Sequence, residues 1–90
     1  MNYLKFSVGS AGPGTVVEVT LRGVESDVYL VDAPNLTAMQ AGRSFQRYGG
    51  HYRASPIRLG VPHHANWTAV VVPVGGKVSA SARILHGAGV

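Results

Sequence analysis

The chain has 90 residues, a formal net charge of +4 and no cysteine. This length allows one domain, and the lack of cysteine excludes disulfides and thiolate–metal staples. Such a short chain buries about 60 to 65% of its extended surface, so a thin apolar core must hold the fold. The segment MNYLKFSVG is not expected to be a signal peptide, and the run TAVVVPVGG is far below the roughly 20 residues that cross a bilayer. We therefore expect a soluble, cytoplasmic protein with no membrane partner.

The first third of the chain predicts three strands. NYLKFSV reads as the first and is followed by the turn GSAGPG. TVVEVTLRG then alternates, with Val17, Val19 and Leu21 on one face and polar residues on the other, which is typical of a half-buried strand. After a second turn, DVYLVD gives a third strand.

The segment DAPNLTAMQAGR does not continue the alternation of apolar and polar residues. Asp32 can cap a helix, Pro34 fits the first helical turn, and Gly42 is a natural stop. We expect one short helix over about residues 34–42.

Two more strands are predicted near the C-terminus. NWTAVVVPV is nearly all apolar, as in a strand covered on both sides, and Pro73 near its end indicates an edge or a bend. GGKVSASARIL alternates, with an inward set of Val78, Ala80, Ala82 and Ile84. The whole pattern predicts a single mostly-β domain over residues 1–85, a small antiparallel sandwich or barrel of six to seven strands with one short helix. Residues 86–90 are expected to form a flexible tail.

The stretch RYGGHYRASPIR, residues 47–58, raises the main functional question. Gly49 and Gly50 stand where the two central residues of a tight hairpin turn would lie. Such turns favour glycine because they need positive φ. This hairpin would place Tyr48, His51 and Arg53 on one face. Beyond it, the apolar alternation fails at Ser55-Pro56, so we predict a bulge or bend there.

Positive charge gathers in the same region. Arginines occupy four positions within sixteen residues that contain no acid, whereas Glu18, Glu25 and Asp27 lie upstream. Guanidinium groups can bind phosphate and aromatic rings can stack on bases. The candidate ligand-binding residues are therefore Arg43, Arg47, Tyr48, His51, Arg53, Arg58 and Trp67, with Trp67 either in the core or at the rim of the site.

Metal binding and catalysis find little support in the sequence. His63 and His64 are adjacent and would point to opposite faces of an extended segment, so they cannot chelate one ion together. The four acids lie outside the arginine-rich stretch, and Asp32 is placed to cap the helix. We expect no metal, no cofactor and no enzymatic activity.

Several segments resemble the DUF1883 family of bacterial proteins, namely VVEVTL, GR…RYGGH, SPIRLGVP, the lone Trp67 and GKVSASARIL. The resemblance runs from about residue 3 to residue 85. It implies a small mostly-β domain of unknown function, found alone or fused to a TIR domain, and it brings no catalytic residues. Where members of that family often have a histidine before the tryptophan, this chain has Asn66, with His63 and His64 displaced upstream.

These observations favour a non-enzymatic binding or sensing module for an anionic, nucleotide-like ligand or a protein partner. A nucleic-acid-binding domain is one alternative, because the chain is basic. The other is a purely structural or oligomerisation domain, in which Arg43 and Arg58 pair with Glu18, Asp27 or Asp32. An apolar set on the outward strand faces, Tyr29, Val31, Val70 and Val72, also favours a homodimer.

Overall fold

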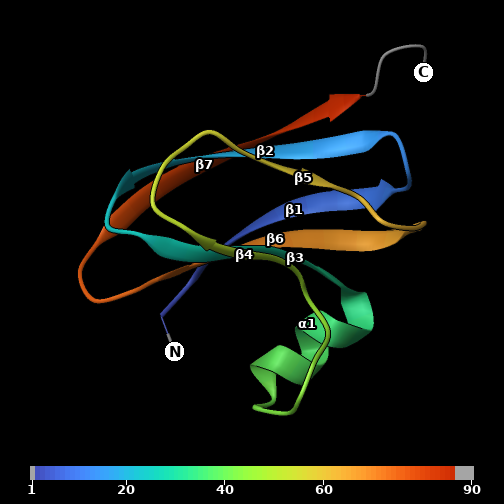
Figure 1. Ribbon diagram of the computed structural model, residues 1–90. Helices are drawn as coiled ribbons and strands as arrows, with labels where there is room; N and C mark the ends of the chain where they lie inside the picture. The colour runs from blue at the N-terminus through green and yellow to red at the C-terminus, as the bar shows by residue number, and fades with distance from the viewer. Residues whose placement is uncertain (1, 87–90) are drawn as a thin grey trace.

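Two antiparallel sheets make up most of the protein. The computed structural model describes residues 2–86. Its elements are β1 (Leu4–Ala11), β2 (Thr15–Gly23), β3 (Ser26–Asp32), α1 (Ala33–Gln40), β4 (Tyr48–Tyr52), β5 (Ile57–Gly60), β6 (Ala65–Pro73) and β7 (Val78–His86). One sheet has the order β1-β6-β3-β4 and the other β5-β2-β7 (Figure 1). The predicted class, a mostly-β sandwich or barrel of six to seven strands with one short helix, is confirmed, and residues 2–86 form the sandwich with seven strands.

The alternating strands β2 and β7 lie side by side in one sheet and turn their apolar faces to the core, as their pattern predicts. On β2, Val17 pairs with Leu59 of β5 and with Ile84 of β7, so this row points inward. Val78, Ala80 and Ala82 of β7 pack against the same core. Ile84 differs, because it remains 41% exposed on β7, which is an edge strand of its sheet.

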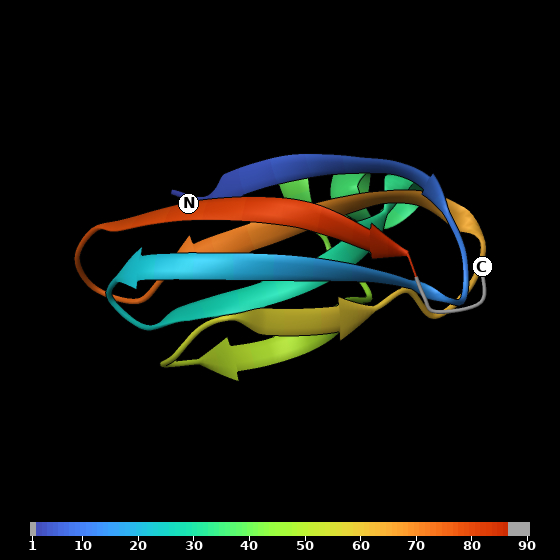
Figure 2. The ribbon, with the colours of Figure 1, turned by 90° about the horizontal axis from the view of Figure 1, so that it is seen from above.

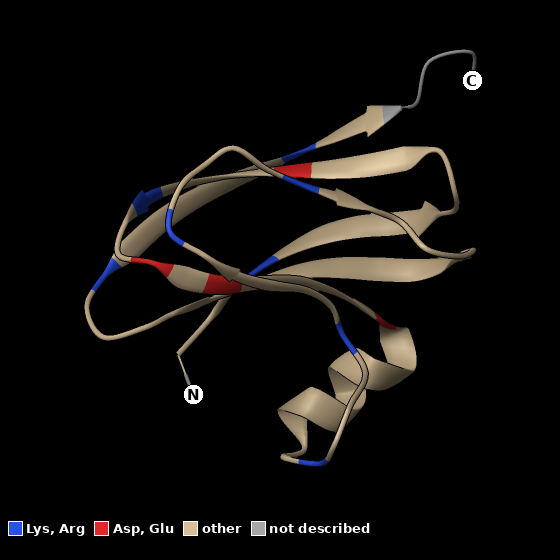
Figure 3. Ribbon diagram, in the orientation of Figure 1, with Lys and Arg blue, Asp and Glu red and all other residues tan. Residues whose placement is uncertain are grey.

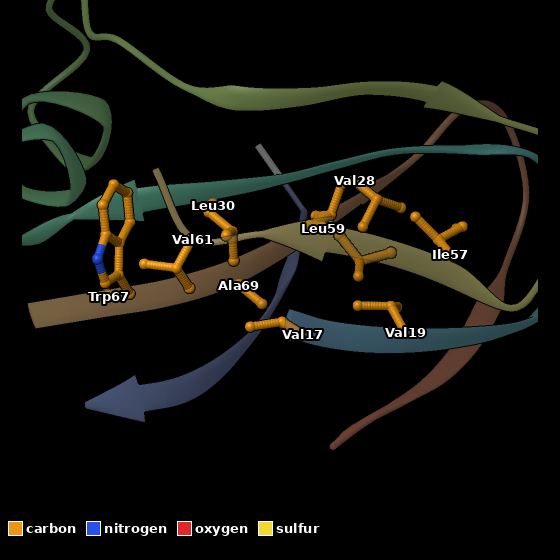
Figure 4. Close-up of a cluster of buried hydrophobic side chains, with 10 residues drawn as sticks. Val17, Val19, Val28, Leu30, Ile57, Leu59, Val61, Trp67 and Ala69 are labelled. Atoms are coloured by element: carbon orange, nitrogen blue, oxygen red, sulfur yellow. The ribbon is translucent and has the colours of Figure 1, made fainter. Parts of the chain in front are cut away.

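The central strands β3 and β6 supply the opposite wall of the core. Val28 and Leu30 come from β3, and Trp67, Ala69 and Val71 from β6, all without solvent exposure. Figure 4 shows side chains from both sheets meeting in this layer. The nearly continuous apolar run of β6 is explained, because β1 and β3 flank it and both of its faces are covered.

Helix α1 covers the outer face of the four-stranded sheet. Met39 lies against Tyr29, Val31 and Val70 in a second buried cluster, with Leu36, Phe45 and Val72 at its border. The outward apolar set therefore packs against the protein's own helix and the segment after it. Hydrophobic exposure of this set was the reason for expecting a homodimer, and the structure removes that reason.

The helix ends follow the sequence signals, although its bounds differ slightly from 34–42. The Asp32 side chain accepts a hydrogen bond from the Asn35 backbone N–H at 3.2 Å, as an N-cap does. At the other end, Gly42 has a φ of +74° and its N–H donates to the Met39 carbonyl at 3.1 Å. The described residues contain no helix long and apolar enough to cross a bilayer.

Three local expectations need correction. Strand β1 continues through the expected turn to Ala11, with a register shift between Ser7 and Gly9, so the turn is confined to residues 12–14. Pro73 lies in a central strand; it is the last residue of β6 and extends beyond the β1 ladder, which ends at the Leu4–Val71 pair. Strand β7 includes His86, and the rest of the expected tail lies outside the described residues.

Candidate functional site

The two glycines of RYGGHY lie inside a strand, so the predicted hairpin is wrong. Strand β4 runs through both and pairs with β3, with Gly49 opposite Tyr29 and Gly50 opposite Val28. Neither glycine has positive φ. Gly49 is required for a different reason: a Cβ there would collide with the Val28 carbonyl and lie 2.7 Å from Tyr29 Cα. A close approach between strands leaves the same sequence signature as a tight turn.

The strand register separates the residues that the hairpin would have joined. Because neighbouring residues of a strand point to opposite faces, Arg47, Gly49 and His51 face outward, whereas Tyr48 and Tyr52 face the core. Tyr48 therefore does not share a face with His51. The expected platform of Tyr48, His51 and Arg53 does not form.

Tyr48 and Trp67 instead meet at the border of the core. Their ring centroids are 5.6 Å apart in an edge-to-face arrangement, and the His63 ring lies 4.9 Å from that of Trp67. Trp67 is fully buried, and its indole N–H donates to the His63 carbonyl at 3.0 Å. The structure thus places Trp67 in the core, one of the two positions that the sequence left open.

After Tyr52 the chain leaves the four-stranded sheet and enters the other sheet at Ile57. This crossing explains why the apolar alternation breaks at Ser55-Pro56, as predicted, and why Ile57 and Leu59 are buried although Arg53 is exposed. The Ser55–Pro56 peptide bond is cis.

The cationic residues are dispersed over the molecule, as the blue Lys and Arg segments in Figure 3 show. Arg58 Nε donates to Glu18 at 3.0 Å, which is one of the pairs expected from a structural role. Arg53 Nε lies 3.0 Å from the Glu25 carboxylate. Arg43 is exposed just beyond α1. Sequence distance from the acids therefore did not mean spatial distance, because antiparallel pairing brings β2 and β3 beside β5 and β4.

A pocket of about 250 Å³ lies on the outer face where β3 meets β4. Its lining residues are Asp27, Tyr29, Arg47, Gly49, Gly50 and His51. The pocket lies between Arg47 and His51, and Gly49 and Gly50 line it with backbone alone. Two candidates from the sequence, Arg47 and His51, and both glycines of the stretch thus meet Asp27 and Tyr29, which the sequence analysis did not place in the site.

Arg47 is held in this pocket by aromatic rings. Its guanidinium carbon lies 5.3 Å from the centre of the Tyr29 ring and 5.7 Å from that of Phe45. These distances are within the range of cation–π contacts. Among the described residues, no carboxylate lies within ion-pairing distance of Arg47.

His51 sits on the other side of the pocket between two carboxylates. Its Nδ1 is 2.9 Å from Asp27 Oδ1, and its Nε2 is 3.5 Å from Glu25 Oε2. The hydrogen bond with Asp27, aided by Glu25 and opposed by partial burial, raises the pKa of His51 above 6.5. Both carboxylates therefore stabilise the imidazolium form, in which both ring nitrogens donate. The sequence signal for this contact is the alternation of DVYLVD, but the pairing of β3 with β4 could not be read from it.

The fold and the pocket define a small β-sandwich with a polar surface site. The chain matches the family described as "Domain of unknown function (DUF1883)" over residues 1–86, and it belongs to that family. No curated protein and no solved structure matches the chain.

Proposed function

We propose that the protein is a non-enzymatic binding or sensing module, and that the pocket between β3 and β4 holds a small anionic ligand with nucleotide-like chemistry. The observation that carries this proposal is the state of Arg47. Two rings hold its guanidinium, and no described carboxylate neutralises it. Its N–H donors are therefore available to an anionic group of a ligand.

The rest of the pocket supports a ligand with more than one functional group. Gly49 presents no side chain, so a ligand can approach the β4 backbone closely. Asp27 binds His51 through Oδ1, which leaves its Oδ2 as an acceptor for a ligand N–H. The volume of about 250 Å³ lies below the range of roughly 300–1,000 Å³ that holds drug-sized molecules. A mononucleotide is the largest ligand that we expect.

The state of His51 supports binding over catalysis. A general base must offer a free lone pair to the proton that it takes. In this pocket both imidazole nitrogens face carboxylates, and their proximity favours the protonated ring. We therefore assign His51 to charge balance and to the positioning of Asp27.

A purely structural role is the rival reading, and it accounts for part of the cluster. Arg53 and Arg58 are engaged by Glu25 and Glu18. A structural role does not account for the pocket between Arg47 and His51. A sensing role also agrees with the TIR fusions that the family resemblance implies, and it would place the module in the cytoplasm.

The test is a thermal-shift screen of mononucleotides, cyclic mononucleotides and small phosphorylated sugars. A ligand present at a hundred times its dissociation constant should stabilise the protein by about 2.7 kcal/mol. Arg47→Gln should abolish this stabilisation because it removes the charge. Arg43→Gln is the matched control, since it makes the same change at an exposed position beyond α1, and it should leave the stabilisation intact.

Amide chemical shifts locate the binding directly. We expect changes at Asp27, Tyr29 and residues 47–51 when a hit is titrated into the protein. A hit that shifts other residues, or an equal loss of affinity in Arg43→Gln and Arg47→Gln, would contradict the proposal. Failure of every compound to stabilise the protein would favour the structural reading.

A further inference from the structure

The outer face of the three-stranded sheet differs from the pocket, because no helix or strand among residues 2–86 covers it. Seen from above in Figure 2, β7, β2 and β5 lie toward the viewer, whereas α1 lies behind the other sheet. The β2–β7 register brings Glu18 opposite Arg83, Thr20 opposite Ser81 and Arg22 opposite Ser79 on this face. Arg58 of β5 joins the first row, because it pairs with Glu18 from the other side.

Glu18 holds two arginines in place at one end of this face. Arg83 Nε donates to its Oε1 at 2.7 Å, and Arg58 Nε donates to its Oε2 at 3.0 Å. Figure 3 shows the red segment of β2 between blue segments of β5 and β7. The Glu18 residue is 6% exposed, whereas the side chains of Arg58 and Arg83 are 63% and 69% exposed. Since both contacts use Nε, the terminal amino groups of each guanidinium remain available to an outside anion.

A hydroxyl-lined hollow lies farther along the same face, beside Arg22. It has a volume of about 350 Å³ and is lined by Thr20, Arg22, Ser79, Ala80 and Ser81. Arg22 is four residues from Glu18 along β2, which at about 3.3 Å per residue separates the two cationic ends by roughly 13 Å. Short hydroxyl side chains between them leave the floor low and supply hydrogen-bond donors.

This face carries a large share of the chain's net charge. Three arginines against one glutamate leave a net charge of +2, which is half of the formal +4 of the whole chain. Strands β2 and β5 and residues 78–85 of β7 contain no Phe, Tyr or Trp that could stack on a base. Binding would therefore depend on backbone phosphates rather than on base identity.

We infer that this outer face, formed by Arg22, Arg58 and Arg83 around the hollow, binds the phosphate backbone of single-stranded nucleic acid without sequence preference. A single strand lying along β2 brings successive phosphates to the Arg58–Arg83 clamp and to Arg22, and the hydroxyls of the floor bind the phosphate or sugar oxygens between them. A duplex would meet this flat face along a line and reach fewer of these donors. The surface is separate from the pocket at β3 and β4, so neither proposal depends on the other.

Fluorescence anisotropy with labelled 12-nucleotide oligo(dT) and oligo(dA) tests the inference. Both should bind with equal affinity at low salt. Each phosphate neutralised on a single strand contributes about −0.7 to the slope of log K against log salt, so three arginines should give a slope of about −2. Arg22→Ala should reduce the slope to about −1.4 and weaken binding about fivefold at 0.1 M salt.

Three variants make the result specific to this face. Arg43→Ala removes the same charge beyond α1, and Arg47→Ala removes it from the pocket; both should leave the affinity and the slope unchanged. Thr20→Glu puts an acid into the exposed floor and should abolish binding while the protein stays folded by circular dichroism. Mononucleotide binding at the pocket should survive Arg22→Ala.

Five outcomes would overturn the inference. Equal weakening by Arg22→Ala and Arg43→Ala would mean attraction to the net charge alone. A marked preference for one base would require stacking elsewhere. Tighter binding of a 12-base-pair duplex would contradict the single-strand assignment, and equal competition by polyglutamate would indicate an acidic protein partner instead. Absence of binding at 20 mM salt would remove the inference altogether.

Discussion

The outer faces of the two sheets differ in polarity and in what covers them, although both belong to the same sandwich. The face of β3 and β6 is apolar and lies under α1, with Met39 packed on Tyr29, Val31 and Val70. The face of β2 and β7 is polar and has no such cover among the described residues. The covered face stabilises the fold and has a pocket at its margin, whereas the open face adds little to the core and carries Arg22, Arg58 and Arg83 at its surface.

The largest effect expected from this comparison concerns the covered face. Met39→Ala should lower the free energy of unfolding by about 2–4 kcal/mol, because it empties a buried site between the helix and the sheet. Ile84→Ala on β7 is the control, since that side chain is 41% exposed, and it should cost about 1 kcal/mol or less. Urea denaturation of both variants checks the difference. Equal losses would mean that α1 contributes little to stability.

Glycines offer a matched comparison between the sheets. Gly49→Ala should destabilise the protein by about 1–3 kcal/mol, because the new Cβ meets the backbone of β3 and forces the strands apart. Gly60→Ala on β5 should be neutral or stabilising by up to about 1 kcal/mol, since open space surrounds that position and the unfolded chain loses freedom. Melting temperatures distinguish them. A neutral Gly49→Ala would show that β4 can move away from β3.

The smallest expected effect is electrostatic. Stability should depend on pH in one direction through His51 at the pocket and in the opposite direction through Glu18 on the open face. The raised pKa of His51 means that its contribution to stability is full below about pH 6.5 and is lost as pH rises through its folded pKa. Glu18 behaves in the opposite way. The Arg83 hydrogen bond, opposed by burial and aided by Arg58, lowers its pKa, so its contribution is present above about pH 4.5 and is lost as pH falls through its folded pKa.

Denaturation midpoints between pH 3 and 9 should therefore show two limbs. His51→Gln should flatten the limb above pH 6.5 and leave the acid limb, whereas Glu18→Gln should change the acid limb alone. If His51→Gln leaves the upper limb unchanged, its carboxylate contacts do not persist in solution.

Most of the architecture could be predicted because local signals carry it. The alternation of TVVEVTLRG and the capping residue Asp32 both depend on near neighbours in sequence, and both were interpreted correctly. The site could not be predicted to the same extent. Its geometry depends on pairing of β4 with β3, and Gly49-Gly50 has the same composition whether it turns the chain or permits a close approach.

The arginines illustrate the same limit. Arg58 was expected either to bind a ligand or to pair with an acid, and the choice depended on whether β5 lay beside β2. A segment without acids in sequence can lie against acids in space, because β-sheet neighbours are set by topology. Arg47 escapes this neutralisation because its neighbours Tyr29 and Phe45 are aromatic.

The strand order also has a consequence for how quickly the chain can reach this structure. Of the seven described strands, β3 and β4 are the one pair that are neighbours both along the chain and within a sheet, and α1 lies between them. The ladder of β2 and β7 joins residues as distant as Thr15 and His86. The described strands include no tight hairpin that could form early. The chain must therefore lose most of its loop-closure entropy before the ladders stabilise it. We expect folding on the millisecond-to-second scale of all-β sandwiches, in spite of the short chain.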